Sequence, residues 1–273
     1  MDMNPVQNGL YRSNTLFAVL LLIIVGSFGM VNKVEASHSW GSYHWARTAN
    51  PFTLQLGDNL SSTWKPYLST ASLDWSQSAV LDTTIVAGLG GKSCRATSGR
   101  VEVCNRKYGN NGWLGLAQIW ISGSHITKGV VKLNDTYFNK STYNKPAWRN
   151  LVMCQEIAHT FGLDHQDEIF NNANLGSCMD YTNDPDGSIK GQADNQFPNQ
   201  HDYDQLVTIY SHLDGFDTAF FSAEKGNNRV EVDLDNPSAW GKIAREDAEG
   251  RASLYERDLG RGGKIFTFVT WAE

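Results

Sequence analysis

The stretch that decides the fold runs from Gln155 to His165 and reads Gln-Glu-Ile-Ala-His-Thr-Phe-Gly-Leu-Asp-His. Residues four apart lie on one face of a helix, so Gln155 and His159 would point the same way. Gly162 can adopt the left-handed conformation that ends a helix, which would turn the chain and bring His165 back toward them. Residues 178–181 then read Cys-Met-Asp-Tyr. The stretch therefore predicts a helix that ends at Gly162, with polar side chains gathered beside that end.

These residues and their spacing resemble the zinc-binding motif of the metzincin peptidases. That motif has a His, a Glu beside it, a second His four residues after the first, a Gly, a third His and then a turn that contains Met. Every element is present here except the first His, in whose place stands Gln155. The resemblance is to matrixin-like and gametolysin-like members, and some gametolysin-like members carry Gln at this position. It is carried by residues 155–181, extends more loosely over residues 50–215 and is absent beyond them.

The resemblance implies an α+β fold: a metzincin (zincin-like) catalytic domain in which a twisted mixed sheet accompanies two long helices. We expect this domain at residues 37–216, with a small C-terminal β extension of unknown role at residues 217–273. An active-site cleft would separate an upper part that carries the sheet from a lower helical part. Residues 117–121 would form the upper rim of this cleft, where an extended substrate adds to the sheet as a further strand.

The resemblance also implies one catalytic Zn²⁺ with Gln155, His159 and His165 as ligands. A fourth position would stay open, as in catalytic rather than structural zinc sites. Such an ion lowers the pKa of its water toward about 7 and polarises a peptide carbonyl. Glu156 would be the general base that takes the proton of the water and passes it to the leaving amine. The competing interpretation of Glu156 is an ordinary exposed helix carboxylate.

Gln155 is the one exchanged ligand. Its side-chain oxygen is as many bonds from the backbone as the outer ring nitrogen of a histidine, and both groups are neutral acceptors. An amide oxygen is a poorer zinc donor than imidazole, so we expect looser metal binding. His201 is the competing third ligand, with a helix-terminal surface histidine as its alternative interpretation. Four further histidines have no partner at the motif spacing: His38, His44, His125 and His212.

The Met-containing turn supplies further roles by the same resemblance. Tyr181 stands two residues after Met179, the spacing at which astacins and serralysins place a phenol near the zinc. It would bind the metal in the resting enzyme or stabilise the oxyanion, and the alternative is a core tyrosine. Met179 would be the hydrophobic floor beneath the histidines. Asp164 and Asp167 would orient the histidine rings through hydrogen bonds, or else lie in solvent.

The chain has four cysteines, and an even number in an exported protein indicates two disulfides. Three pairings are open from the number alone. The resemblance to metzincins selects Cys154 with Cys178, which directly precede the first ligand and the methionine of the turn, and leaves Cys94 with Cys104. The alternative is that Cys154 is a small core residue of the metal helix. A cysteine-rich zinc site is disfavoured because no CxxC spacing occurs.

Composition and the N-terminal segment favour a secreted protein. The 273-residue chain is 41% hydrophobic, which is enough for one large core. An apolar run over residues 16–25 and the small residues of Val-Glu-Ala at residues 34–36 predict a signal peptide at residues 1–36. The alternative is a membrane anchor through residues 15–31. After cleavage we expect no stable membrane association, and a net charge of −6 disfavours nucleic acid as a partner.

Hydrophobic periodicity predicts the other elements. Strands are expected at residues 52–56, 85–87, 116–122, 130–133 and 265–271. Helices are expected at residues 63–79 with Thr63 as cap, from about residues 144–146 to Gly162, and at residues 201–213. The last of these has an apolar side made of Tyr203, Leu206, Val207, Tyr210 and Leu213. Residues 94–112 are polar and predict a loop or hairpin. The turn at residues 183–187 is a weakly supported candidate for Ca²⁺, because its spacing is not that of a complete EF-hand loop.

The sequence thus predicts a secreted zinc-dependent endopeptidase that acts on protein or peptide substrates. One alternative is a catalytically impaired metzincin-fold binding module that lost its first zinc ligand. Another is a secreted carbohydrate-binding protein, suggested only by the 9 tryptophans. Retention of Glu156, which a binding module does not need, favours the enzyme. A cysteine-switch propeptide has no room, so latency would need another device; cleavage specificity and oligomeric state are open.

Overall fold

The computed structural model describes Met1, residues 37–219 and residues 234–272. The predicted signal peptide, its alternative as a membrane anchor, and residues 220–233 of the predicted extension lie outside the described residues. Ser37–Glu273 form one compact unit, as judged by the contacts between their residues. None of the helices that the structure describes is long and apolar enough to cross a membrane.

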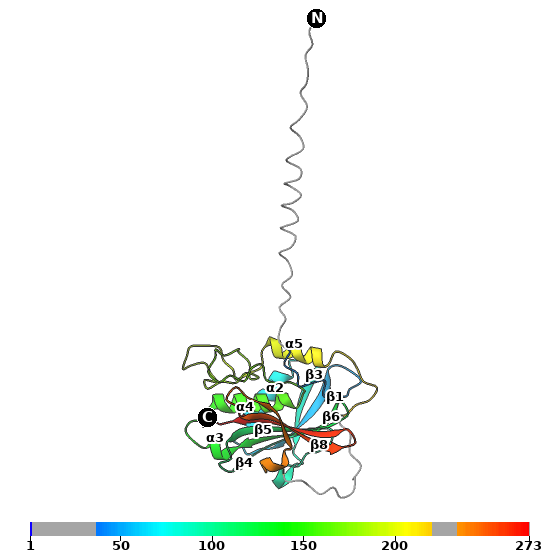
Figure 1. The fold of residues 1–273 in the computed structure, drawn as a ribbon. Coiled ribbons are helices and arrows are strands. Elements are labelled where there is room, and N and C mark those ends of the chain that lie inside the picture. The colour runs from blue at the N-terminus through cyan, green and yellow to red at the C-terminus, as the bar shows by residue number, and fades with distance from the viewer. Residues whose placement is uncertain (2–36, 220–233, 273) are drawn as a thin grey trace. The chain divides into compact units, whose positions relative to one another are not determined.

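One mixed sheet organises the described part of the chain (Figure 1). Its order is β3-β2-β4-β6-β5-β9-β8-β7, and β1 pairs with the start of β6. The strands are β1 (His44–Trp45), β2 (Phe52–Asn59), β3 (Leu81–Ala87), β4 (Val101–Arg106), β5 (Trp113–Ser122), β6 (His125–Asn134), β7 (Lys242–Glu246), β8 (Ala252–Gly260) and β9 (Gly263–Trp271). The half from β3 to β6 is parallel, and the half from β6 to β7 is antiparallel. This mixed α+β architecture agrees with the predicted class.

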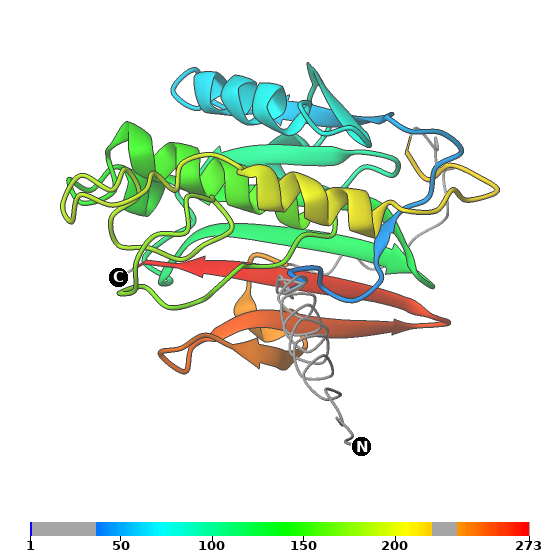
Figure 2. The ribbon, with the colours of Figure 1, turned by 90° about the horizontal axis from the view of Figure 1, so that it is seen from above.

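Helices cover one face of this sheet. The described helices are α2 (Lys65–Trp75), α3 (Asp135–Phe138), α4 (Pro146–His159) and α5 (Gln200–Ile209), with short 3₁₀ turns at Gly91–Ser93 and Pro237–Ala239. Figure 2 shows α2, α4 and α5 on the same side of the strands. The order β2, α2, β3 with parallel strands is the strand–helix–strand crossover that the sequence predicts.

The start of α2 differs from the prediction. Thr63 was expected as the cap, but the helix is preceded by Trp64, and no side chain caps it by a hydrogen bond. Trp64 is 1% exposed, and its ring nitrogen donates to Asp135 Oδ1 at 2.8 Å. Tertiary packing of this tryptophan, rather than a local capping bond, therefore marks the beginning of the helix.

Strand β4 corrects a second prediction. It lies within the polar segment 94–112, which was expected to be a loop or hairpin. Glu102 obscured the strand, because a fully buried carboxylate is unusual in a central strand. Arg100 pairs with it at 2.9 Å and Asn59 donates to it at 2.7 Å. Neutralisation by these neighbours makes its burial tolerable, and a local pattern does not reveal them.

Helix α5 ends earlier than predicted. A capping box between Asn199 and Asp202 fixes its start, and its last residue is Ile209 rather than residue 213. Tyr210 follows the helix, is 1% exposed and donates its hydroxyl to the Phe161 carbonyl. Two positions predicted for the apolar side are exposed instead: Val207 and Leu213. The second of the two expected long helices is therefore short.

The C-terminal segment continues the main sheet. The expected strand at residues 265–271 lies in β9, which pairs with β5 from Trp113↔Trp271 to Ser122↔Gly263. Residues 117–121 were expected to form an open rim, but β5 has β6 on one side and β9 on the other. The red strand of Figure 2 occupies the edge at which a substrate strand was expected. The rim prediction is therefore wrong for this closed arrangement.

Candidate metal centre

Helix α4 carries the predicted site residues and has the predicted start. Pro146 stands in its first turn, where a missing N–H costs nothing. The helix ends at His159, and Gly162 follows with φ +105°. A Cβ atom at Gly162 would lie 2.6 Å from the Tyr43 carbonyl oxygen, so both the conformation and the space require glycine. This turn returns His165 to the end of the helix.

His159 and His165 meet through their outer ring nitrogens. The two Nε2 atoms lie 2.9 Å apart, and the ring planes are nearly perpendicular at 83°. Both residues are buried, with 0% and 7% exposure. The pKa of His159 lies well below its ordinary value, because burial disfavours the charged ring and His165 lies beside it. A neutral His159 is the form that a metal requires.

The inner nitrogens fix where the hydrogens are. His159 Nδ1 lies 2.8 Å from the Leu163 carbonyl, and His165 Nδ1 lies 2.5 Å from Glu168 Oε1. Since both partners are acceptors, both Nδ1 atoms donate, and each neutral ring then keeps a lone pair on Nε2. A second hydrogen on one ring would make this contact an N–H···N hydrogen bond; with both rings neutral, the two facing lone pairs repel unless a cation lies between them. The residues therefore fit Zn²⁺, whose bonds of about 2.0–2.1 Å to nitrogen put tetrahedral neighbours about 3.3 Å apart.

Glu156 lies one helix turn before His159, and its side chain is enclosed against β5 and β9. Its exposure is 0%, and neither carboxyl oxygen makes a hydrogen bond of ordinary geometry to a described residue. Burial raises its pKa to about 8, and the Thr270 hydroxyl offsets part of that rise. Gly115 of β5 makes room for it, because a Cβ there would lie 2.5 Å from Glu156 Oε1. The interpretation as an exposed helix carboxylate is wrong.

Gln155 is 1% exposed and is bound by the C-terminal strand. Its Oε1 accepts a hydrogen bond of 2.8 Å from the Thr270 hydroxyl. In the same strand Phe268 stacks on the His159 ring, with centroids 4.1 Å apart and planes at 11°. Strand β9 therefore lies directly against the predicted ligands.

The turn that contains Met179 meets the chain beside His165. Met179 is fully buried, and its carbonyl accepts from the Gln166 amide at 2.7 Å. Both predicted disulfides are present, with Cys154 bonded to Cys178 and Cys94 bonded to Cys104. The first of these joins the metal helix to the turn.

Tyr181 is 2% exposed, with its ring 4.5 Å from the His165 ring. Its hydroxyl donates to the Val269 carbonyl of β9 at 3.2 Å. Burial raises its pKa well above the ordinary value of a phenol, so the hydroxyl stays protonated and can donate. The phenol is therefore beside the centre but engaged by the C-terminal strand.

The carboxylate that orients His165 was not predicted. Glu168 accepts from Nδ1, and the pKa of Glu168 is lowered because His165 and Arg245 outweigh the effect of burial. Asp164 instead accepts from the His165 backbone amide and from Arg245. Asp167 accepts from the Ile169 amide and from Asn172. The prediction that a nearby carboxylate orients His165 was correct in kind. The path of the loop after α4, which the sequence does not reveal, decides which carboxylate reaches the ring.

Arg245 and Ser253 tie the predicted extension to Glu168. Arg245 of β7 lies 2.9 Å from Glu168 Oε1 and 2.5 Å from Asp164 Oδ2. Ser253 of β8 donates to Glu168 Oε2 at 3.1 Å. The segment for which the sequence indicated no role therefore contributes to the surroundings of the centre from all three of its strands.

His201 does not join the centre. It stacks on His38 with ring centroids 4.7 Å apart, and these two group with Asp202. The turn proposed for calcium directs Asp184 and Asp186 to backbone amides of residues 188–190. Neither carboxylate belongs to a group of three close ligand atoms among the described residues.

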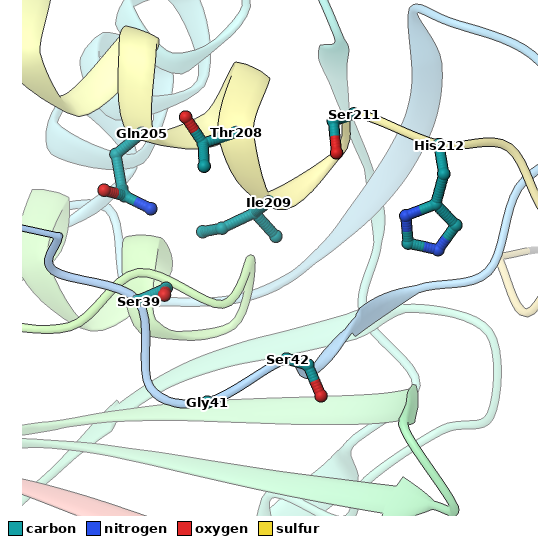
Figure 3. A pocket seen from close by; sticks show the side chains of 8 residues that line it. All are labelled: Ser39, Gly41, Ser42, Gln205, Thr208, Ile209, Ser211 and His212. Atoms are coloured by element: carbon teal, nitrogen blue, oxygen red, sulfur yellow. The ribbon is translucent and has the colours of Figure 1, made fainter.

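An open pocket lies elsewhere on the molecule. Figure 3 shows it between the segment at residues 39–42 and α5, with Gln205 and His212 among its lining residues. None of the predicted metal ligands lines it. The candidate centre is accordingly a covered interior site in this structure, and the pocket is a separate feature.

The chain has little similarity to known proteins. No protein-family model matches it, and no curated protein matches it. Among solved structures it is similar to high choriolytic enzyme 1, a hatching enzyme zinc-protease from Oryzias latipes, the medaka fish. The two chains are 10% identical with a TM-score of 0.35, and the match covers 62% of this chain and 94% of that one. A similarity this weak supports no conclusion about function, so any such conclusion must rest on the residues of the site.

Proposed function

We propose that the protein is a secreted zinc-dependent endopeptidase whose active site is kept closed by its own C-terminal strand. The observation that supports it most is the 2.9 Å contact between the buried Nε2 atoms of His159 and His165, with the enclosed carboxyl of Glu156 one helix turn away on α4. A purely structural histidine pair has no need of an unpartnered carboxyl next to it. Two disulfides are typical of an exported protein.

Each residue has a distinct role in this proposal. His159, His165 and Gln155 would hold the ion, which when bound supplies acidification of water and polarisation of a peptide carbonyl. Glu156 takes a proton onto its carboxyl oxygen and returns it to the leaving amine. Glu168 keeps the hydrogen of His165 on Nδ1, which leaves the lone pair of Nε2 free to bind the ion.

Closure follows from three successive residues of β9. Phe268 stacks on His159, the Val269 carbonyl accepts from Tyr181, and the Thr270 hydroxyl donates to Gln155. The same strand pairs with β5, where an extended substrate would add to the sheet. A peptide substrate and β9 therefore compete for one place, and this competition would keep the enzyme latent.

The test separates β9 from the rest of the folded chain. The turn between β8 and β9 has exposed residues at Gly260 and Arg261, so a specific protease site inserted there can be cut after folding. Release of the cut strand is followed by mass spectrometry, and zinc content is measured before and after. We expect cleavage of an unfolded protein substrate only after release, and renewed inhibition by a synthetic peptide of residues 263–273.

Two variants control this experiment. Glu156→Gln should lower the rate of the opened protein by at least about 100-fold, because a positioned base contributes that much or more. A peptide that carries Phe268→Ala should inhibit less than the native peptide. An opened protein that retains zinc and folding but cleaves nothing would exclude the endopeptidase.

That last outcome would favour the binding module, the second candidate. Strand β9 is also the observation that favours the binding module. It is hydrogen-bonded on both edges, and among the described residues no opening leads to the proposed ligands. In a binding module the zinc would persist, β9 would stay in place, and Glu156 would contribute only to packing.

A further inference from the structure

A second group of histidines converges on one carboxylate oxygen. His44 lies in β1, His125 begins β6, and His212 and Asp214 follow α5. Asp214 Oδ1 lies 3.1 Å from Nε2 of His125, 3.5 Å from Nε2 of His44 and 3.7 Å from Nε2 of His212. The ligand atoms of His44, His125 and Asp214 all lie within 4.8 Å of one another. These are three of the four histidines that have no partner at a motif spacing in the sequence; the fourth, His38, lies elsewhere.

The distances match a set of ligands around one ion. Bonds of about 2.0–2.2 Å to nitrogen and oxygen put the corners of a tetrahedron about 3.3 Å apart. The three separations from Asp214 Oδ1 lie on either side of that value. The rings of His125 and His212 each stand edge to face with His44, at centroid distances of 4.9 and 4.8 Å. All three outer nitrogens lie within 3.7 Å of Asp214 Oδ1, and neither ring stacks on His44.

Hydrogen placement favours a cation at that point. His44 Nδ1 lies 2.8 Å from the Ser42 carbonyl and must donate to it, so a neutral His44 has a lone pair on Nε2. That lone pair faces a carboxylate, which is repulsive without a positive charge between them. A second hydrogen on His44 would remove this repulsion, but it would place a charged ring 4.9 Å from the His125 ring and 4.8 Å from the His212 ring. A divalent cation would bind the His44 lone pair and the Asp214 oxygen together.

The second oxygen of Asp214 is held by other groups. Arg47 binds Oδ2 through its backbone amide at 3.1 Å and its guanidinium at 3.2 Å. The guanidinium of Arg47 forms an ion pair with this oxygen. Arg47 has 0% exposure and fixes the orientation of the carboxylate, as supporting residues do in metal sites. Oδ1 is left to face the histidines.

We infer that His44, His125 and Asp214 form a second metal site for a zinc-class divalent ion, with His212 as its fourth ligand. Four protein ligands leave no open position, so this ion is structural rather than catalytic. It joins β1, the β5–β6 hairpin and the segment after α5, which are far apart in the sequence. His212 is the exposed ligand, with a side chain 57% exposed, and Figure 3 shows its ring beside the pocket. The ion can enter from that side.

The test counts metal ions in the full-length protein. Protein saturated with Zn²⁺ and desalted is analysed for metal content, as wild type and as His125→Asn, His159→Ala and the double variant. We expect two ions per wild-type chain, one in each single variant and none in the double variant. His125→Asp, which retains a ligand atom, should recover part of the affinity, whereas Phe216→Leu removes packing against His125 and should keep both ions.

Failure of this site and failure of the proposed function are distinguishable. One ion that His125→Asn removes and His159→Ala retains would support the second site and remove the catalytic one. A His125→Asn variant that binds as much zinc as the wild type would overturn the inference. If that variant does not fold, Co²⁺ titration of the wild type and of His159→Ala decides, since a His159→Ala protein that binds no Co²⁺ has no second site.

Discussion

The two histidine clusters of this molecule differ in how the chain assembles them. The interior cluster takes His159 and His165 from one helix and the turn that follows it, and β9 covers it. The rim cluster takes His44, His125 and Asp214 from three distant segments and is open to solvent at one ligand. Spacing along the chain therefore reveals the first cluster, while only the folded sheet reveals the second. The interior cluster is buried, whereas the rim cluster is partly exposed. The same kind of substitution should therefore lower the free energy of unfolding by different amounts at the two clusters.

The largest expected difference concerns the aromatic ring that packs on each cluster. Phe268 has 0% exposure and stacks on His159, whereas Phe216 is 49% exposed and meets His125 edge to face at 5.0 Å. Phe268→Ala should lower the free energy of unfolding by about 3–5 kcal/mol, since it leaves a cavity in the core. Phe216→Ala should change it by about 0.5 kcal/mol or less. Urea denaturation in the presence of a chelator measures both, and equal losses would contradict the difference in burial.

An intermediate effect is expected from the acceptor that orients each histidine. His165 donates to the Glu168 side chain, which mutation can change, while His44 donates to the Ser42 backbone carbonyl. Glu168→Gln keeps the size of the side chain but removes the charge, and should weaken zinc binding at the interior cluster by about 10–100-fold. Competition with a chromophoric chelator in a His125→Asn background isolates that cluster.

Two results of that titration are informative. The affinity of the rim cluster for zinc, measured in a His159→Ala background, should not change when Glu168 is replaced by Gln. If Glu168→Gln leaves the affinity of the interior cluster for zinc unchanged, Glu168 does not hold the hydrogen of His165 on Nδ1. The substitution also removes the ionic partner of Arg245, so unfolding curves are recorded alongside to separate metal affinity from stability.

The two clusters show what local sequence reasoning can reach. Helix α4, its start at Pro146 and the turn at Gly162 were predictable, because periodicity and glycine conformation act within a few residues. The disulfide between Cys154 and Cys178 followed from the resemblance, which already implied that the helix and the Met-turn are neighbours.

Contacts that depend on strand order were out of reach. Thr270 and Gln155 are 115 residues apart, and they touch only because β9 inserts between β5 and β8. Strand β4 was missed for a related reason: its buried Glu102 reads as polar until Arg100 and Asn59 are known to lie against it. Long-range pairing decides both, and a pattern of hydrophobic residues contains no information about which distant side chain will neutralise a charge.

The smallest expected effect belongs to His212, and it separates fold from ion binding. Its side chain is 57% exposed, so His212→Ala in metal-free protein should change the free energy of unfolding by about 0.5 kcal/mol or less. If His212 is the fourth ligand of a closed site, the same substitution opens a position to water and weakens the rim ion. Thermal denaturation with and without zinc, in a His159→Ala background, compares the two. Stabilisation by zinc grows with the ratio of free zinc to its dissociation constant, so the zinc-induced rise in Tm should shrink while the metal-free Tm stays the same. An unchanged zinc-induced rise would leave His212 outside the coordination sphere, with solvent as the fourth ligand beside His44, His125 and Asp214.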